Sequence, residues 1–284
     1  MTPKVLIKGG VVLSLGAETP NFEEADVMIE DGRIAEVGPS LRARDAEVID
    51  AADSIVMPGF VDAHRHAWLS IFRNMGADDA LLQQSVAIPD LATHLGPDDV
   101  YASTLVGLLG AIETGITTVV DWSDMLVDES YIDATLQAHS DAGLRTVLVQ
   151  SNARPGSGPA IDNARSLIDR RGPATEALMT FAYGESELEA RSVEALGRDW
   201  AAMMEAGLRV HAHAGVRADT DRIISECSDR GLLGPDVTLI HCSHHSEPDL
   251  DTVKGSGARV VFAPASEMTR GLGSPPVQEL IDRG

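Results

Sequence analysis

Cysteine and basic residues are scarce in this sequence of 284 residues. Its two cysteines, Cys227 and Cys242, are too few for a disulfide framework, so we expect two reduced, buried thiols. Only 22 lysines and arginines face 44 aspartates and glutamates, which gives a net charge of −22. Nucleic acids and anionic membranes bind cationic protein faces, so the charge balance argues against both as partners. No apolar run reaches the length of a membrane span and no leader-like segment opens the chain, which predicts a cytoplasmic protein.

The first 56 residues have the pattern of a small β module. Short apolar segments flank Gly9-Gly10 and Asp31-Gly32, both of which we interpret as tight turns. Helical periodicity is absent from this region. We therefore predict an N-terminal β module, a small β-sandwich or one sheet of it, over residues 1–56, followed by a second domain over residues 57–284.

From Ile55 onward, strand-like apolar runs alternate with amphipathic segments. Seven such runs begin near Phe60, Ile116, Thr146, Leu178, Leu208, Val237 and Val260. Several amphipathic segments end on a glycine, which is typical of helix C-termini. These glycines are Gly115, Gly143, Gly207 and Gly231. Strands that alternate with helices imply parallel pairing, so we predict an α/β fold of the (β/α)8 TIM-barrel type. We expect the long segment 67–95, after the first strand, to form a lid or a substrate wall.

Histidines stand at the ends of three predicted strands. His64 and His66 follow Pro58-Gly59-Phe60-Val61-Asp62-Ala63, and they share a face because strand side chains alternate. His213 and His241 also end strand-like runs, and His211 shares the face of His213. Neutral imidazole is a good ligand for zinc, iron or manganese. The pattern predicts a metal centre at the carboxyl ends of the strands, but spacing alone does not distinguish His211 from His213.

These segments resemble the amidohydrolase superfamily of metal-dependent hydrolases, and within it the branch of cytosine deaminases and triazine hydrolases. The resemblance is carried by segments 58–66, 113–121 and 263–268 and by the two later histidines, in the family's order. It implies that His64, His66 and His213 bind one divalent metal, zinc first, with iron or manganese as alternatives. It also implies that His241 lies near the metal, as a ligand or as a proton carrier.

Two features of the family are unmatched. A closed barrel needs an eighth strand, which in the family carries a metal-binding aspartate, whereas this sequence ends on a predicted helix over residues 277–282. We expect the chain to be a fragment of a longer protein, because an open barrel exposes unpaired strand edges. Completion by a partner chain and inactivity of this chain alone are the alternatives. In addition, the family's deaminases place a glutamate three residues after the strand-five histidine, where this sequence has Val216.

Other polar side chains supply the remaining candidates. Glu267 follows the seventh predicted strand and is, together with His241, a candidate catalytic residue for proton transfer. Candidate substrate-binding residues follow the first four strands, at the end where barrel enzymes bind their substrates. They are Trp68 and Arg73, Trp122 and Asp124, Asn152, and Tyr183.

The predicted function follows from the metal centre. A metal held by three histidines and one carboxylate keeps an open position for water and lowers the pKa of that water. The sequence therefore predicts a metal-dependent hydrolase of non-peptide C–N bonds in a small cyclic substrate. The absence of the glutamate favours hydrolysis of an amide, ester or C–halogen bond as an alternative. The absence of the eighth strand favours a non-catalytic metal-binding or scaffold protein as another. Assembly into a homo-oligomer stays open.

Overall fold

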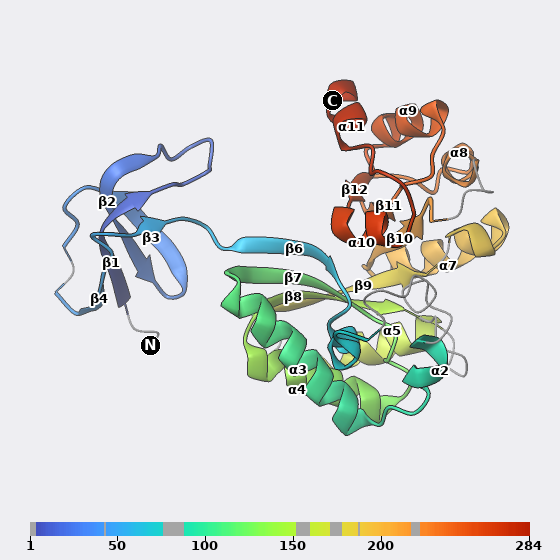
Figure 1. The fold of residues 1–284 in the computed structure, drawn as a ribbon, viewed down its shortest axis with the longest axis horizontal. Helices are drawn as coiled ribbons and strands as arrows, with labels where there is room; N and C mark the ends of the chain where they lie inside the picture. Colours follow the sequence, from blue (N-terminus) through green and yellow to red (C-terminus); the bar gives the residue numbers. More distant parts are fainter. Residues whose placement is uncertain are drawn as a thin grey trace. The chain divides into compact units, whose positions relative to one another are not determined.

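The computed structural model describes residues 4–42, 44–75, 88–151, 160–170, 178–186, 188–216 and 222–284. The chain divides into two compact units, Met1–Phe60 and Val61–Gly284 (Figure 1).

The first unit is a β-sheet. Its strands are β1 (Lys4–Val12), β2 (Phe22–Glu30), β3 (Arg33–Gly38), β4 (Ala46–Asp50) and β5 (Ile55–Val56). They follow the order β3-β2-β1-β4, with β5 also paired to β1. Strand β1 is antiparallel to β2, and it runs parallel to β4 and β5. One buried cluster covers this sheet, around Val12, Ala25 and Val27. The described residues of the unit thus form a single sheet, and a second, facing sheet is not among them.

The two predicted turns have different outcomes. Asp31 and Gly32 have φ angles of 50° and 73° and join β2 to β3, as predicted for a tight hairpin. The prediction of a turn at Gly9-Gly10 was wrong, because β1 continues through both residues and only its register against β2 shifts there. A Cβ atom on Gly10 would lie 2.7 Å from Cγ2 of Val56. The glycine therefore permits the close approach of β5 to β1.

The second unit alternates strands with helices. Its strands are β6 (Phe60–Arg65), β7 (Ile116–Ser123), β8 (Arg145–Ser151), β9 (Met179–Glu185), β10 (Arg209–Ala214), β11 (Val237–His241) and β12 (Arg259–Val261). Its helices are η1 (Ala67–Phe72), α2 (Ile88–Ala92), α3 (Pro97–Glu113), α4 (Glu129–Ala142), α5 (Ala160–Asp169), η2 (Leu188–Ala190), α7 (Val193–Glu205), α8 (Ile223–Asp229), α9 (Glu247–Ser256), α10 (Pro264–Thr269) and α11 (Val277–Arg283).

The seven strands form one nearly closed parallel barrel sheet, in the order β12-β11-β10-β9-β8-β7-β6 (Figure 1). This order confirms the predicted α/β barrel class with seven βα units. Within the described residues, β6 and β12 are the two ends of the order. The four glycines predicted at helix ends all have positive φ angles, between 68° at Gly231 and 83° at Gly115. These helices therefore stop where the sequence predicts.

Alternation along the strands separates two buried layers. Trp122, Val149, Ala182 and Ile240 pack together in the barrel interior. Their strand neighbours point outward and pack against the helices, as Phe181 does in the cluster that contains Leu196 and Trp200. Parallel strands bring all their carboxyl ends to one rim of the barrel. The histidines predicted as ligands follow or end these strands, so they gather at that rim.

Candidate metal centre

Strand β6 and the residue after it place two imidazoles side by side. His64 lies in β6 and His66 follows the strand, and their Nε2 atoms are 3.2 Å apart. The ring centroids are separated by 4.8 Å with the planes nearly perpendicular, so the rings meet at their nitrogen edges rather than stacking. The period-two spacing of the sequence produces this convergence.

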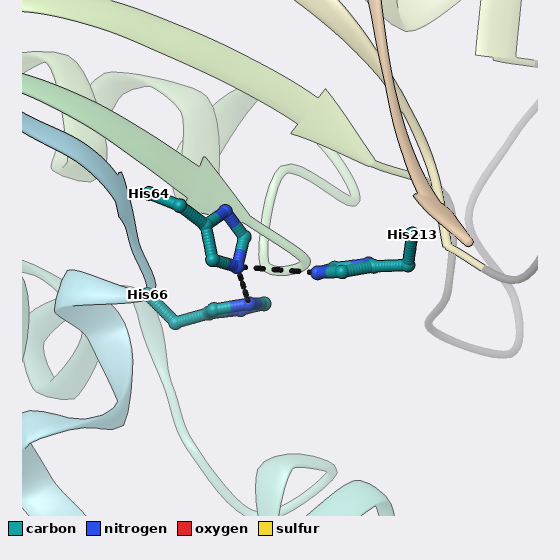
Figure 2. Close-up of side chains that lie close together, drawn as sticks. All are labelled: His64, His66 and His213. Carbon is teal, nitrogen blue, oxygen red and sulfur yellow. Dashed lines mark hydrogen bonds between the residues drawn. The ribbon is translucent and has the colours of Figure 1, made fainter. Parts of the chain in front are cut away.

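Strand β10 brings a third imidazole to the same point. The Nε2 atom of His213 lies 3.2 Å from Nε2 of His64, from the opposite side of the pair (Figure 2). The ligand atoms of His64, His66 and His213 all lie within 4.8 Å of one another. No other group of histidine, cysteine and carboxylate side chains converges in this way among the described residues. His211 lies one pleat below, buried, with its Nδ1 atom lacking a hydrogen-bond partner in the described part of the chain.

The three histidines fit a divalent metal ion. Burial, and then the charges of the neighbouring imidazoles, hold the pKa values of His64 and His213 well below their usual value. Both rings are therefore neutral at physiological pH, the form that binds metals. Two nitrogens each ~2.0–2.1 Å from a tetrahedral ion lie ~3.3 Å apart. The observed Nε2 separations of 3.2 Å are close to this value.

Trp122 and Asp124 support the histidines from the end of β7. The buried ring of Trp122 has its centroid 4.2 Å from that of His213. Its Nε1 donates to Oδ1 of Asp124 at 2.8 Å, and Oδ2 of Asp124 lies 3.4 Å from Nδ1 of His66. Burial alone would raise the pKa of Asp124, but the contacts and charge of His66, with the indole of Trp122, hold it below its usual value. A carboxylate on the far nitrogen of a ligating histidine fixes the orientation of that ring.

His241 forms a buried pair with Glu267 beside the three histidines. Its ring stacks near His213, with centroids 5.2 Å apart, and lies 5.7 Å from His64. Its Nδ1 atom lies 2.9 Å from Oε1 of Glu267, which is fully buried on α10. Burial lowers the pKa of His241, while the hydrogen bond and charge of Glu267 act in the opposite direction. The structure thus places His241 beside the converging histidines and pairs it with Glu267, the other predicted catalytic residue.

The loops after β10 and β11 are tied together by their backbones. The N–H of Cys242 donates to the carbonyl of Ala214 at 2.8 Å, and the N–H of His244 donates to that of Gly215 at 2.9 Å. A Cβ atom on Gly215 would lie 2.5 Å from the carbonyl oxygen of His244. His241 has a φ of 80°, which is unusual for a residue with a side chain. Such strain is typical of functional positions.

The residues predicted to bind substrate in the segment after β6 lie in different environments. Trp68 is buried in a cluster with Ala92, Val100 and Met125, and Arg73 is exposed at the end of η1. The first part of the predicted lid is therefore a packed 3-10 helix. Asn152 and residues 76–87 of the lid lie outside the described residues.

Tyr183 is not brought to the histidines. It points into the helix layer, where its hydroxyl donates to Oε2 of Glu185 at 3.2 Å. The neighbouring Gly184 faces the interior instead, because a Cβ atom there would lie 2.9 Å from the ring of Trp122. Neighbouring residues of a strand point to opposite faces, so an error of one residue in β9 explains why the sequence analysis placed Tyr183 at the site.

The sequence analysis missed a buried partner of the site, His139 on α4. Its Nε2 lies 2.9 Å from Oδ2 of Asp121 on β7, and both residues are buried. The available signal was its spacing: His139 follows Ile132 and Thr135 at helical intervals on the buried face of α4. A polar ring at such a position needs a hydrogen-bonding partner.

Known proteins share this architecture. The chain is 30% identical over 297 residues to a 5'-deoxyadenosine deaminase of Methanosarcina mazei, covering 99% of this chain and 67% of the relative. The crystal structure of an adenosine deaminase from Xanthomonas campestris with bound zinc aligns with a TM-score of 0.83 at 21% identity, over 99% of this chain and 67% of that one. An atrazine chlorohydrolase from Arthrobacter aurescens TC1 complexed with zinc aligns with a TM-score of 0.81 at 22% identity, over 98% and 69%.

A parallel βα barrel with histidines converging at its carboxyl rim defines the class of metal-dependent barrel hydrolases. The particular family is shown by the sequence, because the profile of the amidohydrolase family matches residues 55–284. The chain belongs to the amidohydrolase family, and it is therefore an enzyme rather than a scaffold. In the part of the chain that the structure describes, no helix combines the length and apolar character needed to cross a bilayer. A cytoplasmic location and a homo-oligomeric state stay predictions.

Proposed function

We propose that the protein is a zinc-dependent hydrolase that removes an amino group from a ring carbon of a small heterocyclic substrate. His64, His66 and His213 bind the metal in this proposal. The observation that carries it is the convergence of three imidazoles, with Nε2 of His64 3.2 Å from Nε2 of both His66 and His213, and with the His241–Glu267 pair beside them. The deaminases among the similar proteins support the substrate class.

His241 is suited to move protons at its Nε2 atom. An ionised carboxylate only accepts hydrogen bonds, so Nδ1 of His241 donates to Glu267 and Nε2 keeps its lone pair. Burial lowers the pKa of His241, so the ring is neutral near pH ~7 and can accept a proton from water. A bound divalent cation supplies the Lewis acidity that lowers the pKa of that water. His241 then returns the proton to the leaving nitrogen of the substrate.

A second candidate reaction is hydrolysis of a carbon–halogen bond. Val216 stands where the resemblance places a glutamate that protonates the substrate. A halide needs no proton to leave, whereas an amine does. Val216 cannot carry a proton. If the His241–Glu267 pair does not protonate the leaving group either, hydrolysis of a carbon–halogen bond is favoured.

The test is a product assay on the full-length protein after metal analysis. Ammonia release is measured from 5'-deoxyadenosine and adenosine, and chloride release from atrazine, with and without a chelator. We expect about one zinc per chain and chelator-sensitive release of ammonia. Chelator-sensitive chloride release without ammonia release would favour the second candidate. Bound zinc with no turnover of any of these compounds, or turnover that chelators leave intact, would refute the proposed deaminase.

A further inference from the structure

A buried polar network lies on the helix side of β7, behind the metal centre. Oδ2 of Asp121 lies 2.9 Å from Nε2 of His139, and Nδ1 of His139 lies 3.1 Å from Oγ1 of Thr146 on β8. The other carboxylate oxygen, Oδ1, accepts the backbone N–H of Ala67 at 2.7 Å. All four residues are at most 2% exposed. Four elements, β7, α4, β8 and η1, therefore meet in one hydrogen-bonded chain.

This hydrogen-bond network ends at Ala67, one residue from a proposed metal ligand. Ala67 follows His66 directly, so Asp121 accepts a hydrogen bond from the peptide group that joins these two residues. The rest of η1 is seated against α3: Oγ of Ser103 donates to the carbonyl of Trp68 and accepts the N–H of Ile71 at 2.8 Å. A Cβ atom on Gly107 would lie 2.8 Å from the carbonyl oxygen of Ala67. Asp121 is the anchor of this segment that lies nearest to His66.

The directions of the hydrogen bonds follow from the donors. Asp121 accepts at both oxygens as a carboxylate, so Nε2 of His139 carries the hydrogen of that contact. Nδ1 of His139 lies beside the hydroxyl of Thr146, which is also 3.4 Å from the carbonyl of Leu144. Asp121 and His139 each contact two buried partners, so neither side chain can rotate without breaking a bond between buried atoms. Breaking such a bond leaves a buried polar atom unpaired, which destabilises the folded protein. The Asp121 carboxylate is thus fixed in direction as well as in place.

We propose that Asp121 and His139 are positioning residues for the metal centre. His139 fixes the carboxylate of Asp121, the carboxylate fixes the peptide of Ala67, and this holds His66 where its Nε2 meets that of His64. The inference rests on the proposed metal site. Neither residue touches the metal or the reacting atoms, and their effect reaches the site through the backbone. Loss of an outer partner of this kind lowers metal affinity ~10–100-fold.

The test compares four variants of the full-length protein, of which the fourth, Thr146→Val, is needed only if His139→Leu does not fold. His139→Leu removes the donor to Asp121, and His139→Gln keeps an amide N–H at similar reach. The matched control is Asp249→Asn on α9, another buried aspartate with hydrogen bonds, from Ser225 and Ser246, on a helix that carries no ligand. Zinc affinity is measured by chelator competition, ligand geometry by the absorption spectrum of the cobalt(II)-substituted protein, and stability by denaturation of the metal-free protein.

We expect His139→Leu to weaken zinc binding ~10–100-fold and to alter the cobalt spectrum, and His139→Gln to recover most of both. Asp249→Asn should lower the unfolding midpoint and leave affinity and spectrum unchanged. If His139→Leu affects stability alone, the network is only structural and the inference fails. If that variant does not fold, Thr146→Val decides, because it removes the hydroxyl that contacts Nδ1 of His139. Wild-type zinc affinity and a wild-type cobalt spectrum in Thr146→Val would then refute the inference. Wild-type protein that binds no zinc refutes the proposed metal site instead, which separates the two failures.

Discussion

Glu267 and His241 form a buried pair, with 2.9 Å between Oε1 of the carboxylate and Nδ1 of the imidazole. The same oxygen accepts the backbone N–H of Ala263 at 2.8 Å, at the start of α10. The carboxylate is thus anchored by its own helix before it meets the histidine. Oε2 is buried and has no hydrogen-bond partner among the described residues. Glu267 therefore orients the His241 ring, and one of its oxygens is left unpaired within the described chain.

Replacing Glu267 by glutamine tests this pair. Glu267→Gln keeps the size of the side chain but removes the charge that stabilises a protonated His241, so we expect turnover to fall ~10²–10⁴-fold. Zinc content should stay at the wild-type level, because Glu267 is not a proposed ligand. Glu279→Gln, at an exposed position of α11, is the matched control and should be indistinguishable from wild type. Steady-state kinetics with metal analysis gives the answer, and a wild-type rate in Glu267→Gln would contradict the role of the pair.

Alanine substitutions distinguish ligands from proton carriers. His64→Ala and His213→Ala should remove most of the zinc and nearly all turnover, because each supplies one of three converging nitrogens. His241→Ala should lower the rate and leave most of the zinc in place. Metal content by atomic spectroscopy, beside activity, separates these effects. Equal zinc loss in all three variants would show that His241 is a full ligand.

Local rules in the sequence predict a good part of this architecture, and long-range packing accounts for the rest. Strand alternation predicts that His64 and His66 share a face, and the turn chemistry of Asp31-Gly32 predicts a hairpin. Tyr183 was misplaced because one residue decides which face of β9 points inward, and the small Gly184 occupies the interior position under Trp122. The pairing of His139 with Asp121 depends on how α4 packs on β7, 18 residues away in sequence. No local pattern contains that information.

Acid should destabilise the metal-free protein in a defined pH range. Burial, and then the charge of Arg209, lower the pKa of His211 to about 4, below the ~6.5 of an unfolded chain. The unfolded chain therefore binds more protons between these values, so stability is intact above pH ~6.5 and is lost as the pH falls toward ~4. His64 and His213 act in the same direction.

His211→Gln removes one of these titrating groups. Between pH ~7 and pH ~5, the loss of unfolding free energy should be about 2 kcal/mol smaller in the variant than in wild type. Urea denaturation of the metal-free proteins at the two pH values measures the difference. The same loss in both proteins would mean that His211 is not buried as a neutral ring.

Gly215 should be the glycine least tolerant of a side chain near the site. Its φ is 62°, and an added Cβ would lie 2.5 Å from the carbonyl oxygen of His244 and 2.9 Å from Cα of Cys242, both backbone atoms. Gly215→Ala must therefore push apart the loops that follow β10 and β11, the strands that carry His213 and His241, and it should weaken zinc binding as well as stability. Gly231→Ala is the control, since Gly231 has a φ of 68° with nothing within 4 Å of the added atom. In that control, the unfolding free energy should fall by only about 1–2 kcal/mol, which is the cost of placing a residue with a side chain in the left-handed region. Its zinc affinity should stay at the wild-type level. Denaturation and chelator competition on both variants make the comparison. Equal losses of stability with unchanged zinc affinity in both would show that the contact between the two loops does not position the histidines.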